Sequence, residues 1–220
     1  MSSTRDDVDR ESSGGRRNQL LVVLVTVALV IAVTLVIVAV TDGGGTVTPD
    51  SEQFRPVQVD GDPLVPFGGD TLGDPALGAI APVISGASFD GSPVVIGPGS
   101  PTLVVFLAHW CPHCQAEVPM LVEWAESLRV PFGLDVFAVA TATSADRPNY
   151  PPSLWLERER FPFPVLADDA SSTAAAAFGT TGFPQLVMLS PAGEVMWRYS
   201  GQTPDGLLEQ LVAESLAALG

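Results

Sequence analysis

The sequence has no lysine, only two cysteines and only two histidines among its 220 residues. Two cysteines cannot staple a chain of this length, so they can form no more than one local pair. All ten basic residues are arginines, and against 25 acidic residues they leave a formal net charge of −15. A chain this acidic repels phosphate backbones, which argues against nucleic acid as a partner.

The acidic excess lies in one part of the chain. Residues 1–40 contain four arginines and four acidic residues, so residues 41–220 carry the entire net charge of −15. An acidic surface on this larger part is expected to keep a folded domain soluble. Residues 1–19 are polar and lack apolar periodicity, and they are predicted to form a disordered tail.

A long apolar run without any charged residue occupies residues 20–40. Its length meets the requirement of about 20 residues for a helix that crosses a bilayer. A cleaved signal peptide is the alternative, but its apolar region is usually about 7–15 residues long, and no clear small-x-small cleavage site follows here. No cysteine near the end of the run could take a lipid, which excludes a lipoprotein. We therefore expect residues 20–40 to be a retained transmembrane anchor.

The basic residues around this run predict its orientation. Arg16 and Arg17 directly precede the run, and the next basic residue is Arg55. By the positive-inside rule the N-terminal tail is cytoplasmic and the rest of the chain lies outside. We expect a single-pass protein of the cell membrane with an extracytoplasmic domain. Residues 41–76, rich in Gly, Pro and Asp, are predicted to be a flexible linker; whether parts of it pack on the domain is left open.

Residues 77–220 have the length and the alternating pattern of one α/β domain. Helices are expected to lie on a mixed sheet. The predicted elements are a hairpin over 83–96, a strand over 102–108, a helix over 112–128, a strand over 134–141, a short helix over 153–160, an extended piece over 164–167, a small helix over 174–178, a hairpin over 185–200 and a helix over 204–219.

The two cysteines, Cys111 and Cys114, are three residues apart at the junction between the strand over 102–108 and the helix that starts at Pro112. The free N–H groups and the positive end of a helix at this place favour a thiolate over a thiol. Proline suits the first helical turn, where its missing N–H costs nothing. The pair is therefore predicted to alternate between a dithiol and a Cys111–Cys114 disulfide.

The residues around the pair receive roles from their positions. Cys111, at the helix start, is predicted to be the nucleophile, and Cys114, one turn in on the buried side, the resolving thiol. His113 can donate to the Cys111 sulfur or place a charge beside it. Glu117, on the next turn, is predicted to relay a proton to or from Cys114, with a capping or pairing role as the alternative.

Two further aromatic or imidazole side chains flank the pair. Trp110 is expected to shape the surface around the dithiol, whereas His109 is either a tuning group or a bystander. Trp155, on a short helix that we expect to be exposed, is a weaker candidate for a substrate contact.

Four features lie along residues 77–220. They are Ala81-Pro82 before a hairpin, the segment from Ala108 to Cys114 after a strand, Glu117 and Pro119 after the second cysteine, and Thr181-Gly182-Phe183-Pro184 before a late strand. In these features and in their order, the domain resembles the thioredoxin superfamily, and within it the membrane-anchored TlpA-like thiol–disulfide oxidoreductases.

The resemblance implies a thioredoxin-like fold, with a central mixed sheet flanked by helices, and a second part of the site. Pro184 should follow a cis peptide bond and place the Phe183 backbone next to Cys111, ready to pair with an extended substrate segment. An ordinary proline at the start of a strand is the alternative. Trp110, Pro112 and Phe183 are accordingly assigned to substrate binding.

The sequence departs from the family pattern in two places. Pro112-His113 between the cysteines is typical of the oxidising DsbA type, whereas the body of the domain resembles reductases, including those that act in cytochrome c maturation. The direction of electron transfer stays open. The buried carboxylate that many thioredoxins carry six residues before the first cysteine is replaced by Val105, which leaves Glu117 as the nearest proton acceptor.

The expected function is disulfide exchange with exported proteins, supported by a redox partner in the membrane and without any cofactor. One alternative is a protein that binds copper or zinc through Cys111, Cys114 and either His109 or His113. Copper carriers with this fold usually have more widely spaced cysteines and a distant histidine, and Pro184 over the thiols would block a metal. A second alternative is a structural domain with an inert disulfide.

Overall fold

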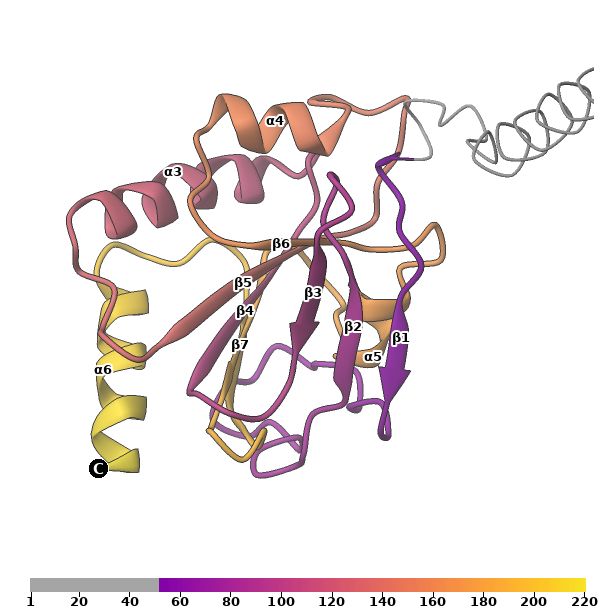
Figure 1. Ribbon diagram of the computed structural model, residues 1–220. Helices are drawn as coiled ribbons and strands as arrows, with labels where there is room; N and C mark the ends of the chain where they lie inside the picture. The colour runs from indigo at the N-terminus through magenta and orange to yellow at the C-terminus, as the bar shows by residue number, and fades with distance from the viewer. Residues whose placement is uncertain (1–51) are drawn as a thin grey trace, which may run out of the picture. The chain divides into compact units, whose positions relative to one another are not determined.

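The apolar runs of the sequence form a five-stranded mixed sheet in the computed structural model, which describes residues 52–220 (Figure 1). Strand β4 is central: it runs parallel to β5 and antiparallel to β7. The strands, in their order across the sheet, are β6 (Val165–Ala167), β5 (Asp135–Ala140), β4 (Thr102–Leu107), β7 (Gln185–Leu189) and β8 (Val195–Ser200).

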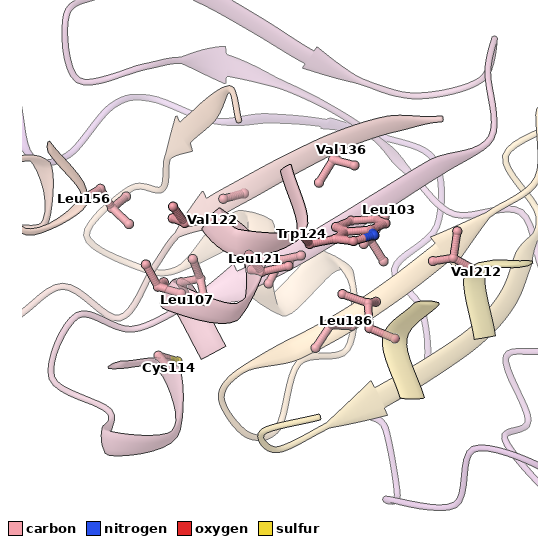
Figure 2. Packing of buried hydrophobic residues seen from close by; sticks show 14 of the residues in the cluster. Leu103, Leu107, Cys114, Leu121, Val122, Trp124, Val136, Leu156, Leu186 and Val212 are labelled. Atoms are coloured by element: carbon pink, nitrogen blue, oxygen red, sulfur yellow. The ribbon is translucent and has the colours of Figure 1, made fainter. Parts of the chain in front are cut away.

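Alternation along β4 divides the interior into two buried clusters, one on each face of the sheet. Leu103, Val105 and Leu107 belong to the cluster that also contains residues of the helices α3 (Pro112–Glu126) and α6 (Leu207–Leu219). Figure 2 shows members of this cluster, which include Leu121, Trp124 and Leu186. Val104 and Phe106 belong to the opposite cluster.

The opposite cluster includes residues of a second, three-stranded antiparallel sheet and of α5 (Thr173–Ala177). The sheet contains β1 (Gln58–Asp60), β2 (Val83–Ala87) and β3 (Pro93–Ile96). The hairpin between β2 and β3 turns at Asp90 and Gly91, as predicted, where the Asp90 carboxylate accepts the Ser92 N–H and Gly91 has a φ of 88°. The remaining helix of the described residues is α4 (Pro152–Arg158).

Residues 52–76 are part of the folded unit, which corrects the described portion of the linker predicted over 41–76 and moves the start of the domain ahead of residue 77. Strand β1 pairs with β2, and Leu64 and Phe67 are buried. The sequence leaves this packing open because the apolar residues are few and are interrupted by prolines and glycines, so that no period extends over more than a few residues.

A buried ion pair fixes the same segment. Arg198 of β8 donates from Nε to the Asp74 carboxylate at 2.6 Å and from Nη1 to the Val65 carbonyl at 2.9 Å. Burial alone would favour the neutral acid, but the Arg198 guanidinium holds the pKa of Asp74 below its usual value. A buried arginine requires such a partner, so this pair ties the N-terminal segment to the sheet.

The predicted tail and membrane anchor, over residues 1–19 and 20–40, lie outside the described residues. Within residues 52–220, the helices are all too short or too polar to span a bilayer.

The predicted elements of residues 83–219 are present in the structure, with shifts of a few residues at their ends. At the start of α5, the Asp168 carboxylate accepts the N–H groups of Ala174 and Ala175, and the Asp169 carboxylate accepts that of Thr173. One detail differs from the prediction. Trp155 is buried, not exposed, because it belongs to the cluster under α3.

Candidate active site

Cys111 lies at the end of the segment that connects β4 to α3. It is the N-cap residue of α3 and is followed by Pro112 at the first helical position. Its side chain is 7% exposed, so the sulfur is close to the surface without being free of the protein. The Cys111 Sγ donates to the carbonyl oxygen of Phe183 at 3.3 Å. The structure thus confirms the predicted approach of these two residues.

Phe183 and Pro184 are joined by a cis peptide bond, as predicted. The ladder between β4 and β7 stops at the Phe106–Gln185 pair, one residue after Pro184. Within the described residues the N–H of Phe183 donates no hydrogen bond, and its carbonyl accepts only from Cys111. This backbone unit is therefore available to an extended segment that approaches the sulfur.

Cys114 lies one helical turn further in and is fully buried. Both cysteines are present as free thiols, and the Ala108 N–H donates to the Cys114 sulfur at 3.4 Å. Burial raises the pKa of the Cys114 thiol far above its ordinary value, and the nearby Cys111 and Glu117 raise it further. Cys114 therefore needs a base to become a nucleophile.

Glu117 follows Cys114 by three residues, a spacing that puts both on one face of α3. Its carboxyl group is fully buried and accepts two hydrogen bonds from Thr203, from N–H at 2.8 Å and from the hydroxyl at 2.7 Å. Burial raises the pKa of Glu117 despite these two bonds. A buried carboxyl group near a buried thiol is suited to proton exchange.

His109 holds a loop instead of a metal or a thiol. The ring is buried, with Nδ1 2.6 Å from the Pro148 carbonyl and Nε2 accepting the Ser144 N–H at 3.2 Å. These partners fix the neutral tautomer that carries its proton on Nδ1, and burial lowers the pKa of the imidazole. His109 thereby anchors the loop over residues 141–151 beside the dithiol.

Trp110 joins the same loop to the Phe183 side of the site. Its Nε1 donates to the Ala142 carbonyl at 2.8 Å, and its ring meets the Phe183 ring edge-on at 6.2 Å between centroids. The Arg147 guanidinium carbon lies 4.8 Å from the centre of the Trp110 ring, a cation–π contact. Sequence reasoning missed Arg147, because nothing in a polar loop marks which side chain returns to the site.

Pro112 and His113 are exposed at the start of α3. His113 takes part in no hydrogen bond within residues 52–220, so the predicted donation to Cys111 is absent there. The two residues form the outer surface of the turn that carries the nucleophile.

The donor set of a metal centre is not assembled within residues 52–220, where no three His, Cys, Asp or Glu side chains come together suitably. Both ring nitrogens of His109 are used by the loop, and His113 is on the exposed side of the turn. The geometry does not favour the copper- or zinc-binding alternative.

The chain is similar in sequence to a known protein family and to characterised proteins. The sequence profile of the AhpC/TSA family matches residues 73–198. The thiol:disulfide interchange protein DsbE homolog of Paracoccus denitrificans is 29% identical over 137 residues, which cover 60% of this chain and 70% of that protein.

Two solved structures are similar to the described domain. One is the crystal structure of a Chlorobium tepidum protein assigned as a thiol:disulfide interchange protein DsbE, with a TM-score of 0.54, 26% identity, and coverage of 66% of this chain and 98% of that one. The other is the solution structure of a Neisseria meningitidis protein assigned as a thioredoxin, with a TM-score of 0.53, 27% identity, and coverage of 62% and 89%. The thioredoxin-like fold predicted from the sequence is confirmed.

Proposed function

The chain belongs to the AhpC/TSA family, and from this premise we propose that it is a thiol–disulfide oxidoreductase that acts through Cys111 and Cys114 on exported proteins. The observation that carries the proposal is the position of the Cys111 sulfur, 3.3 Å from the carbonyl of Phe183 at the end of β7. At this place an incoming polypeptide would meet both the nucleophile and the Phe183 N–H, which donates no hydrogen bond within the described residues.

The chemistry needs both cysteines and a proton acceptor. When a client disulfide is reduced, the Cys111 thiolate attacks one client sulfur, and the other client sulfur leaves as a thiolate. Cys114 then gives its proton to Glu117 and attacks the Cys111 sulfur of the mixed disulfide. The client leaves with both sulfurs reduced, and the protein keeps the Cys111–Cys114 disulfide. Oxidation of a client is the reverse sequence.

The surface around the sulfur selects an extended polypeptide. The Phe183 backbone offers one hydrogen-bond donor and one acceptor to a strand-like segment, and Trp110 and Pro112 border the same surface. Backbone pairing is insensitive to side chains, which suits an enzyme that meets many unfolded clients.

The location follows from the sequence. A transmembrane anchor over residues 20–40 with a cytoplasmic N-terminus holds the domain outside the cytoplasm, where its clients are exported proteins. Each turnover leaves the pair in the opposite redox state, so a membrane redox partner must restore it. Apocytochromes that await haem attachment are the client class that the TlpA-like resemblance favours.

Equilibration of the full chain with glutathione buffers tests the proposal. We expect reversible formation of one intramolecular disulfide, lost in Cys111→Ser. A reduction potential of roughly −120 mV would make the protein a disulfide donor, and one of roughly −270 mV a reductase. A pair that does not equilibrate with glutathione would overturn the proposal and favour an inert structural disulfide.

A further inference from the structure

We propose that Thr203 is a positioning residue for the dithiol reaction, which holds Glu117 in place and connects this buried carboxyl group to solvent in a cleft between α3 and α6. This inference rests on the proposed function, because it concerns the proton that Cys114 gives up or takes back. It adds a residue from the other end of the chain that no cysteine motif contains.

Both carboxyl oxygens of Glu117 accept a hydrogen bond from Thr203. Thr203 is 2% exposed, and it donates both its N–H and its hydroxyl to Glu117, one to each carboxyl oxygen. No other hydrogen bond to the Glu117 side chain occurs within the described residues. The orientation of the carboxyl group on α3 is therefore set by one residue of the segment between β8 and α6.

Thr203 also lines a cleft of about 290 Å³, together with Met120 and Trp124 of α3 and with Pro204 and Leu208. Neither cysteine lines this cleft, nor do Trp110 and Phe183. The cleft is therefore distinct from the surface where a client meets Cys111. In the proposed relay, water in the cleft next to Thr203 supplies the proton while a client covers the dithiol.

Reduction of the Cys111–Cys114 disulfide by a small dithiol requires one proton at Cys114. The thiolate of the dithiol attacks Cys111 in the protein disulfide, the Cys111–Cys114 bond breaks, and Cys114 takes a proton from Glu117. The Glu117 carboxylate recovers a proton from water in the cleft through the Thr203 hydroxyl. The second thiol of the dithiol loses its proton to solvent and attacks the dithiol sulfur that is bonded to Cys111. The mixed disulfide breaks, the cyclic disulfide forms, and Cys111 leaves as a thiolate.

Few charges surround Glu117. The other titratable groups on α3 and its N-cap are Cys111, His113, Cys114, Glu123 and Glu126. Burial raises the pKa of Glu117, and the two Thr203 hydrogen bonds oppose that rise. The charged residues of the cleft are Glu123, Arg129, Asp205 and Glu209. Arg129 pairs with Glu209 at 2.7 Å and with Glu123 at 3.4 Å. Within the described residues, Thr203 is the one residue that donates hydrogen bonds to the Glu117 carboxyl group.

The test follows reduction of the oxidised full chain by dithiothreitol, with intrinsic tryptophan fluorescence as the readout, over a range of pH. Thr203→Val should slow the reaction about tenfold, less than the loss of the carboxyl group itself in Glu117→Gln. The ratio of its rate to that of the wild type should change with pH, because dithiothreitol titrates identically in both. Thr203→Ser, which keeps the hydroxyl, should stay within about twofold of the wild type.

A matched control is Thr102→Val. This threonine is as buried as Thr203 and is the first residue of β4, at the end of the strand that lies away from the dithiol. Its hydroxyl donates to the Ser100 carbonyl at 3.0 Å. Its removal should leave a pH-independent ratio near one. If Thr203→Val does not fold, Thr203→Ala serves as the second variant.

Three results would overturn the inference. The first is a ratio of the Thr203→Val rate to the wild-type rate that does not change with pH, and the second is equal rates for Thr203→Val and Thr203→Ser. The third is that Thr203→Val slows the Glu117→Gln variant by the same factor as it slows the wild type. Failure of the proposed function is seen separately, because the wild type itself would then not react through Cys111.

Discussion

The sulfur of Cys111 lies 3.3 Å from the carbonyl oxygen of Phe183, although the two residues are 72 positions apart. Cys111 caps the start of α3, and Phe183 directly precedes Pro184 and β7, the strand that pairs with β4. Their contact places a reactive sulfur against a residue whose backbone N–H donates no hydrogen bond within residues 52–220. The site can therefore hold a polypeptide and react with it at the same place.

Glu117 should make the domain less stable as the pH rises. Burial raises its folded-state pKa above the ordinary value of about 4.3, so the folded chain binds this proton more tightly than the unfolded chain does. Stability from this group is complete below about pH 4 and is lost as the pH rises through the folded-state pKa. Asp168, whose pKa burial also raises, contributes with the same sign.

Glu117→Gln removes one of these two contributions. Denaturant unfolding of the reduced protein from about pH 4 to pH 8 should show the variant gaining stability relative to the wild type as the pH rises. A constant difference over this range would show that the carboxyl group keeps an ordinary pKa.

The buried Arg198–Asp74 pair should dominate the attachment of residues 52–76. Asp74→Ala leaves a guanidinium buried without its carboxylate, which should cost about 3–5 kcal/mol of unfolding free energy. Glu209→Ala, which breaks the half-exposed pair with Arg129, should cost about 0–1 kcal/mol. Chemical denaturation measures both, and similar costs would contradict the assignment.

Trp110 should matter more for protein clients than for small reagents. Its ring packs on Phe183, so Trp110→Ala removes part of the surface that borders the Phe183 backbone. We expect kcat/KM to fall about tenfold or more for an unfolded protein disulfide, with dithiothreitol reduction changed little. Arg147→Ala, which removes only the cation above the ring, is the milder comparison. An equal loss with both substrates would assign Trp110 to the reaction itself.

The fold was largely predictable because its strands and helices carry clear periods. Leu103, Val105 and Leu107 alternate with Val104 and Phe106, and the dipeptide turns fall between such runs. The two thiols were predictable from their spacing, and the cis bond before Pro184 from the resemblance.

Contacts between side chains far apart in the sequence were not predictable. Thr203 lies 86 positions after Glu117, and Arg198 lies 124 positions after Asp74. Such pairs are set by how elements pack, and neither partner has a local pattern that names the other. The same reason explains why the sequence does not mark Arg147 and why it leaves the packing of residues 52–76 open.

The measurement that tests the central claim most directly is trapping of a mixed disulfide with an unfolded disulfide-containing client, followed by mass spectrometry. Cys114→Ser should accumulate a covalent adduct on Cys111, since the resolving thiol is missing. Cys111→Ser should accumulate none, because Cys114 is buried and holds its proton tightly. An adduct on Cys114, or no adduct with either variant, would contradict the account.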